Sequence, residues 1–153
     1  MTTHEMWMVK VIEEANAAEK DGEAPIAAMV VQGDKILGIG RNTKTSEHCG
    51  FMHAELNALL AAKPLLGRKP EGVVLYTTLE PCAMCLGAII FSGIRTVVIG
   101  APDPLAGAVN MLRQHPPYAE WMPDIIEGVL EDECEALLAL PTFNKAREST
   151  TAV

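Results

Sequence analysis

The stretch from Gly72 to Gly93 constrains the fold more than any other part of the chain, because a buried strand leads there into an apolar helix. Its first part, GVVLYTTL, is rich in β-branched residues and almost wholly apolar, as expected for a central strand buried on both faces. After Glu80-Pro81, the segment CAMCLGAIIFS predicts a helix that ends at Gly93. A strand buried on both faces needs helices on either side, so this stretch favours an α/β protein.

The segments before this junction supply further elements. Residues 4–20 carry apolar side chains at helical spacing and predict an amphipathic helix that ends near Asp21. IAAMVVQGDKILGIG predicts two short strands joined by a turn at QGD, hence a hairpin. HAELNALLAA predicts a helix that stops at Pro64, because a proline disfavours the helical conformation in the residue before it.

The segments after the junction complete one sheet. TVVIG predicts another buried strand, DIIEGVL a last strand, and EDECEALLAL a helix ended by Pro141. Residues 101–124 are rich in proline and polar groups and predict an irregular stretch with one short helix, and the tail after about residue 145 is expected to be frayed. The order of elements predicts a single domain over residues 1–153, with one mixed sheet covered by helices on both faces.

Composition narrows the class of protein. The chain of 153 residues is 49% hydrophobic and 21% charged, as in ordinary globular proteins, and no apolar run approaches the ~20 residues of a membrane span. The start, MTTHEMWMVK, lacks the pattern of a signal peptide, so the four cysteines are expected to be reduced thiols in the cytoplasm. The net charge of −8 weighs against a protein whose main work is binding the phosphates of nucleic acids.

Candidate metal ligands open two of the predicted helices: HAE places His53 and Glu55 at one start, and PCAMC places Cys82 and Cys85 at the other. The partial positive charge of a helix N-terminus favours the thiolate form of cysteine, which binds metals. One imidazole and two thiolates make a three-ligand zinc site whose fourth position can hold water. Glu55 is too close to His53 to bind the same metal comfortably, but it is placed to handle the proton of that water.

Three other interpretations compete with a catalytic metal. A C-x-x-C pair after a strand is also typical of thioredoxin-like redox proteins, although such a pair needs neither His53 nor Glu55. Cys49 could be a fourth ligand, which would make the closed site of a structural zinc-binding protein. His53 and Glu55 could also merely cap a helix. The presence of four residues suited to a catalytic metal site at two helix starts favours that site over the other three interpretations.

The motifs HAE (residues 53–55) and PCAMC (residues 81–85) resemble the H-x-E and P-C-x-x-C signature of the zinc-dependent cytidine deaminase-like superfamily. APIAAMVV, GRN, LYTTLEPCAMCLGAIIFSGIRTVVIGAPD and IIEGVLEDECEALL are similar to the corresponding stretches of bacterial tRNA adenosine deaminases and of cytosine and guanine deaminases. The resemblance covers most of residues 5–140. It implies a three-layer α/β/α fold with a central mixed five-stranded sheet.

The resemblance also implies the site and its chemistry. One zinc ion per chain would be held by His53, Cys82 and Cys85, and it would lower the pKa of its water. Glu55 would pass the proton of that water to a ring nitrogen and then help to protonate the leaving amine, so that ammonia departs and a carbonyl remains. Relatives of this length pair through helices like CAMCLGAIIFSGI, which is apolar on most faces, so a homodimer is expected.

Three residues are implied as substrate contacts. The backbone N–H of Ala54 and the side chain of Asn42 in GRN match groups that contact the base in the family, although Asn42 could instead close its own turn. Asp103 matches an acidic position at the pocket rim of the tRNA enzymes, although between two prolines it could merely shape the loop. His48, Tyr118 and Trp121 are weaker candidates for the site, and Cys134 falls on an apolar helix face that predicts the core.

Departures from the family pattern bear on the substrate. The tRNA enzymes usually carry a Pro-Thr-Ala-like run before the histidine, where this chain has GFM (residues 50–52), whose bulky Phe51 and Met52 are expected to narrow the pocket entrance. Pro102 and Leu105 stand where the tRNA enzymes have basic residues around Asp103, and a strongly basic C-terminal extension is missing. The sequence therefore favours a hydrolytic deaminase of a free nucleobase or related heterocycle (cytosine, guanine, adenine or triazine type). A tRNA adenosine-34 deaminase is the alternative, and nucleic acid is the less favoured partner.

Overall fold

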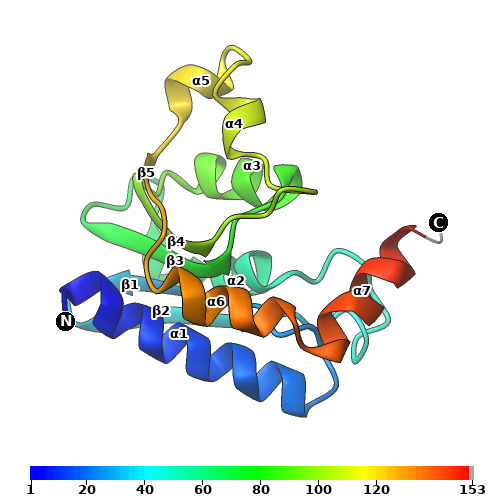
Figure 1. Ribbon diagram of the computed structural model, residues 1–153. Coiled ribbons are helices and arrows are strands. Elements are labelled where there is room, and N and C mark those ends of the chain that lie inside the picture. The colour runs from blue at the N-terminus through cyan, green and yellow to red at the C-terminus, as the bar shows by residue number, and fades with distance from the viewer. Residues whose placement is uncertain (152–153) are drawn as a thin grey trace.

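A computed structural model describes residues 1–151 of the chain, which form a five-stranded sheet in the order β2-β1-β3-β4-β5 (Figure 1). β1 (Ala27–Gln32) and β2 (Lys35–Arg41) form the predicted antiparallel hairpin. β3 (Val73–Leu79) pairs antiparallel with β1 and parallel with β4 (Thr96–Ala101), and β5 (Asp124–Ile126) pairs parallel with β4. The sheet is therefore mixed, with β3 at its centre.

Helices cover both faces of this sheet. α2 (Ala54–Leu66) and α3 (Ala83–Ser92) enclose one apolar cluster, and α1 (Thr3–Lys20) and α6 (Glu131–Leu138) enclose the other, which contains Cys134 as expected. Figure 1 shows α1 and α6 side by side under the sheet and α2 and α3 beyond it. The three-layer α/β/α fold with a mixed five-stranded sheet is confirmed.

Two glycines of β2 let α2 approach the sheet unusually closely. A Cβ atom at Gly40 would lie 2.0 Å from the carbonyl oxygen of Ala54, and one at Gly38 would lie 2.4 Å from that of Ala58. No other residue type fits at these positions without moving the helix. The backbone of β2 therefore fixes the first turns of α2, and with them the position of His53, its N-cap residue.

Several boundaries differ from the sequence-based prediction. The helix expected to stop at Pro64 continues to Leu66 and reaches Gly67, because a proline in the last turn removes a single backbone hydrogen bond there. Residues 101–124 contain two short helices, α4 (Val109–Leu112) and α5 (Tyr118–Trp121), instead of one. The last strand is confined to the three residues of β5.

The end of the chain is also different. Where a frayed tail was expected after about residue 145, α7 (Pro141–Thr151) continues the chain as a helix. Figure 1 shows α7 beyond the end of α6, at the side of the molecule where the loop before α2 also lies. Within the described residues, no helix combines the length and the apolar character that crossing a membrane requires.

Candidate zinc and substrate site

The starts of α2 and α3 bring the predicted metal ligands together. His53 and Cys82 are the N-cap residues of the two helices, both with extended backbone, and Cys85 lies in the first turn of α3. Their ligand atoms all lie within 4.8 Å of one another, with Cys85 buried and the other two partly buried. The two helices thus deliver an imidazole and two thiols to one point at the edge of the sheet.

The distances suit one zinc ion. His53 Nδ1 lies 3.5 Å from the Sγ atom of Cys82 and 3.6 Å from that of Cys85. A tetrahedral zinc with ordinary Zn–N and Zn–S bonds would separate its nitrogen and sulfur ligands by about 3.6 Å. The donor set and its spacing therefore fit the metal. Among the residues that the structure describes, Cys49 is not part of this group, so the closed structural site receives no support.

The three ligand groups shift each other's proton affinity. The pKa of Cys82 falls to about 4 because its sulfur accepts a hydrogen bond from Cys85, which has the larger effect, and one from His53. The hydrogen bond to Cys82 raises the pKa of His53, and the pKa of Cys85 is raised by its hydrogen bond to Cys82 and by burial. Cys82 is thus a thiolate at neutral pH, which is the form that binds a metal.

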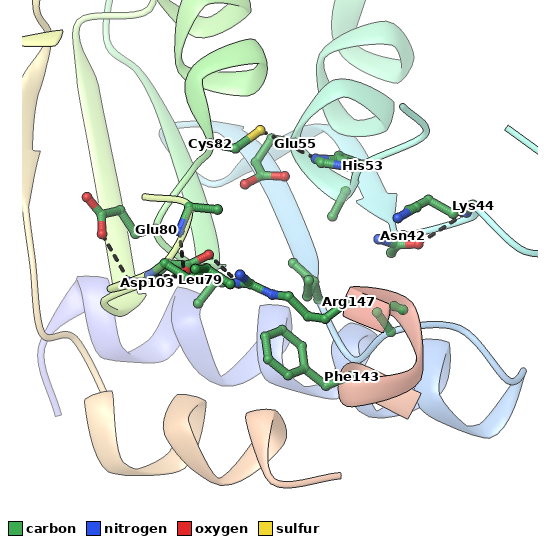
Figure 2. A pocket seen from close by; sticks show the side chains of 16 residues that line it. Asn42, Lys44, His53, Glu55, Leu79, Glu80, Cys82, Asp103, Phe143 and Arg147 are labelled. Carbon is green, nitrogen blue, oxygen red and sulfur yellow. Dashed lines mark hydrogen bonds and ion pairs between the residues drawn. The ribbon is translucent and has the colours of Figure 1, made fainter. Parts of the chain in front are cut away.

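Glu55 lies beside this group on the first turn of α2. Its side chain is only 4% exposed, and burial raises its pKa to about 6. Figure 2 shows its carboxylate directed into the pocket, next to Cys82 and His53. A buried carboxylate facing both the metal ligands and an open cavity is placed to exchange protons with a bound molecule.

The ligand group opens into a cavity of about 200 Å³. Its walls come from the starts of α2 and α3, the loop after β2, the loop after β4, and α7. All three predicted substrate contacts line it: Asn42, Ala54 and Asp103. Asn42 is buried and its side-chain oxygen accepts the backbone N–H of Lys44, so it closes its own turn and also lines the pocket. In Figure 2 its nitrogen faces the cavity.

Other predicted residues lie elsewhere. Phe51 is 55% exposed, and neither it nor Met52 lines the cavity, so the expectation that they narrow the pocket entrance is wrong. His48 is exposed in the loop before α2. Tyr118 and Trp121 pack edge-on against each other and against Phe91 of α3, away from the lining residues.

The sequence did not point to one acidic and one basic residue that shape the rim of the cavity. Glu80 accepts hydrogen bonds from the backbone N–H groups of Asp103 and Val109, at 3.0 and 3.3 Å, and so fixes the loop after β4. Arg147 of α7 donates to the carboxylate of Asp103 at 2.5 Å. Glu80 could have been found from its place between the strand and PCAMC, but nothing local in the sequence marks Arg147.

The loop that carries Asn42 and Lys44 is also held in place. The buried carboxylate of Glu23 accepts the N–H groups of Thr45 and Ser46, at 3.1 and 2.6 Å. These charge-assisted hydrogen bonds tie the loop to the end of α1 and keep its lining residues next to the zinc ligands.

Comparison with known proteins agrees with this geometry. The family described as "Cytidine and deoxycytidylate deaminase zinc-binding region" matches residues 1–101. The chain is 38% identical to the tRNA-specific adenosine deaminase of Bacillus subtilis over 144 residues, which cover 91% of this chain and 88% of the relative.

Two solved structures extend the comparison. One comes from studies of A-to-I editing by tRNA:A34 deaminases at the wobble position, and it is 34% identical with a TM-score of 0.78, covering 86% of this chain and 97% of that one. The other is the guanine deaminase of Nitrosomonas europaea, 28% identical with a TM-score of 0.76, covering 90% of this chain and 84% of that one. The fold is therefore shared with a structure from work on tRNA:A34 deaminases and with a guanine deaminase.

Proposed function

Because the chain belongs to the cytidine and deoxycytidylate deaminase zinc-binding family, we propose that it is a hydrolytic deaminase whose substrate is an adenosine in a tRNA anticodon. The observation that carries the choice of substrate is the presence of Lys44 in the wall of the zinc pocket, since the other cation there, Arg147, is paired with Asp103. Cationic side chains beside a base pocket are what an RNA substrate needs, because the target base is flanked by phosphates.

The chemistry follows from the residues around the pocket. A zinc ion would be held by His53, Cys82 and Cys85, and it would supply a water molecule of lowered pKa to the cavity. Glu55 takes a proton from that water and gives it to the ring nitrogen next to the amino-bearing carbon, which makes this carbon more electrophilic. The oxygen of the water forms a bond to this carbon, and Glu55 then carries the second proton of the water to the departing amine. The C–N bond breaks, a carbonyl remains on the ring, and ammonia leaves.

Contacts to the base come from groups that already line the cavity. Asn42 presents its side-chain nitrogen, and the backbone N–H of Ala54 is one of the first N–H groups of α2, which lack partners within the helix. Both can donate to acceptors on the edge of a purine. The apolar walls, which include the partly buried Ile26 and the buried Leu79, suit the flat faces of the ring.

This proposal reverses the preference drawn from the sequence. The free-base interpretation depended partly on Phe51 and Met52 at the pocket entrance, and neither lines the cavity. It also depended on a shortage of basic residues near Asp103, whereas Lys44 and Arg147 both lie in the pocket wall. The net charge of −8 opposes the binding of nucleic acid, but at physiological salt the charges farther than about 8 Å from a phosphate are largely screened.

A free purine base is the second candidate. The observation that favours it is the size of the cavity, since about 200 Å³ is below the ~300–1,000 Å³ typical of pockets for larger ligands. The likeness to a guanine deaminase of similar fold supports the same reading. In both cases the reacting group is an exocyclic amine on a heterocycle.

Ammonia release over a defined panel separates the two. The panel contains an anticodon stem-loop with adenosine at position 34, the same RNA with guanosine there, and free adenine, guanine and cytosine. We expect the highest kcat/KM for the adenosine stem-loop at physiological salt. A free base with an equal or higher kcat/KM would overturn the tRNA proposal. The Glu55→Gln variant gives the background rate of ammonia release for each substrate.

We also propose that two copies of the chain pair through α2 and α3. Leu60 and Phe91 on these helices are 52% and 71% exposed, and they line a surface groove together with Leu56, Leu59 and Leu66. Apolar side chains gathered on one face in this way are typical of a subunit interface.

A further inference from the structure

Glu23 is a buried carboxylate that the proposed chemistry does not use. It lies just after α1, where its own N–H donates to the carbonyl oxygen of Ala18 at 3.0 Å, and the residue is only 4% exposed. One of its side-chain oxygens accepts the N–H of Thr45 at 3.1 Å, and the other accepts that of Ser46 at 2.6 Å. Burying a carboxylate costs free energy unless its oxygens are hydrogen-bonded, so these two N–H groups are what makes its burial possible.

The two donors belong to the loop between β2 and α2 (residues 42–53). Residues 47–49 of this loop donate their N–H groups to carbonyl oxygens of the same loop, at 3.0 to 3.3 Å. Such bonds shape the loop but do not fix its place in the protein. Thr45 and Ser46 are exposed residues, yet their N–H groups reach the buried carboxylate of Glu23. Glu23 therefore attaches the middle of the loop to the end of α1.

The same part of the loop orients Asn42 in the pocket wall. The N–H of Lys44 donates to the side-chain oxygen of Asn42 at 3.1 Å, and the amide nitrogen of Asn42 then faces the cavity (Figure 2). The backbone of Asn42 has an anchor of its own, because its N–H donates to the carbonyl oxygen of Ile26 at 3.2 Å. The direction of its carboxamide depends instead on where the Lys44 N–H lies. Thr45, which Glu23 holds, is the next residue along the chain.

We propose that Glu23 is a positioning residue for the base that is deaminated, because it keeps the Lys44 N–H where it orients the Asn42 carboxamide. Glu23 itself is not one of the described residues that line the cavity, so it acts through the loop. A carboxamide that is oriented in advance binds a base without first having to be ordered, which strengthens binding. The inference rests on the proposed deamination at this pocket, with Asn42 donating to the base, and not on tRNA being the substrate.

The attachment of the loop can be tested without a substrate. Hydrogen exchange of the Thr45 and Ser46 amides is measured by NMR in the zinc-loaded wild type, Glu23→Gln and Glu13→Gln. We expect both amides to be protected in the wild type and to exchange about tenfold faster in Glu23→Gln, because glutamine has one acceptor oxygen and its NH₂ group would face the second donor. Glu13→Gln is the matched control, since it makes the same change at an exposed position of α1. Unprotected amides in the wild type, or equal exchange in the wild type and Glu23→Gln, would overturn the proposal.

The effect on the base is measured by kinetics on the substrate of the panel that has the highest kcat/KM. A contact made equally in the ground state and the transition state affects KM and not kcat. We therefore expect Glu23→Gln to raise KM by about fivefold or more, with kcat and zinc content within about twofold of the wild type. Loss of folded protein would instead lower the apparent kcat at an unchanged KM. Glu23→Ala, which removes both acceptors, should raise KM in the same way and takes the place of Glu23→Gln if that variant does not fold. An unchanged KM would overturn the proposal.

A double variant shows whether Glu23 acts through Asn42. In Asn42→Ala there is no carboxamide to orient, so adding Glu23→Gln to this variant should leave KM unchanged, although it raises KM in the wild type. If the stem-loop is the substrate, all four proteins also carry Lys44→Ala, which keeps the backbone N–H but removes any phosphate contact of this side chain. An equal rise of KM in both backgrounds would overturn the role through Asn42.

The two proposals fail independently of each other. A free base with the highest kcat/KM of the panel would overturn the tRNA substrate, while a rise of KM for that base that depends on Asn42 would uphold the role of Glu23. Conversely, a stem-loop with the highest kcat/KM and a KM that does not respond to Glu23→Gln would uphold the tRNA substrate and overturn the role of Glu23.

Discussion

Nδ1 of His53 lies 3.5 Å from Sγ of Cys82, although the two residues are 29 positions apart in the chain. Each is the N-cap residue of a different helix, and α2 packs both against β2 and against α3. The chemistry of the site therefore depends on the packing of α2 and α3 against one sheet.

Zinc content should depend on Cys82 and not on Cys49. We expect Cys82→Ser to lose most of the bound zinc, because serine does not provide a thiolate ligand. Cys49→Ser should keep about one zinc per chain, because Cys49 lies outside the ligand group. Metal analysis of the purified proteins measures both. Zinc lost from Cys49→Ser but kept in Cys82→Ser would contradict the ligand assignment.

Glu55→Gln should keep zinc and fold but lose turnover. The amide has nearly the shape of the carboxylate and cannot take up a proton, so we expect kcat to fall by roughly 10²–10⁴-fold on the best substrate of the panel. Thermal unfolding and metal analysis serve as controls for the fold and the zinc. A variant that kept more than about a tenth of the wild-type rate would show that another group carries the protons.

Gly40→Ala should destabilise the protein. The added Cβ would lie 2.0 Å from the Ala54 carbonyl oxygen, so α2 must move, and overpacking of this kind costs about 1–3 kcal/mol in the free energy of unfolding. Gly50→Ala is the control, because its Cβ meets nothing within 4 Å, and we expect a change within about 0.5 kcal/mol. Urea denaturation measures both. Equal stability of the two variants would refute the close approach of α2 to β2.

Lys44→Ala should weaken RNA deamination selectively. If Lys44 contacts a phosphate, kcat/KM for the stem-loop falls and the slope of log(kcat/KM) against log[salt] becomes shallower by about 1. Activity on a free base should change little. Lys35→Ala, at an exposed position outside the pocket lining, is the matched control and should alter neither quantity. An identical loss in both lysine variants would point to overall charge instead of a contact at the site.

Phe91→Glu should separate the proposed dimer. Phe91 is 71% exposed on α3, and a charge buried in an apolar interface without a partner opposes association. Light scattering at micromolar concentration is expected to give a dimer for the wild type and a monomer for the variant. Met6→Glu, on α1 and 50% exposed, should leave the oligomeric state unchanged. A monomeric wild type would remove the interface altogether.

Much of the fold and the reactive groups could be predicted from local patterns. Periodicity and helix starts indicated the two layers of helices and the mixed sheet. This works because the spacing of apolar residues along a strand or helix shows which of its faces are buried. Spacing within HAE and PCAMC likewise indicated His53, Glu55, Cys82 and Cys85, since each motif lies within one helical turn. Pro64 shows the limit of such rules, because the last turn of α2 tolerates a residue that normally ends a helix.

The sequence by itself therefore determined which residues we propose as zinc ligands and as proton carrier, because each motif is contained in a short segment. Tertiary structure alone decided what surrounds them. It placed Phe51 outside the pocket and Arg147 in its wall, joined to Asp103 across 44 positions of the chain. Neither outcome is visible locally, because the direction in which a loop or a terminal helix packs depends on contacts with distant elements. The packing of these segments decides which molecules fit the pocket. The HAE and PCAMC motifs indicate the reaction, in which a C–N bond is broken.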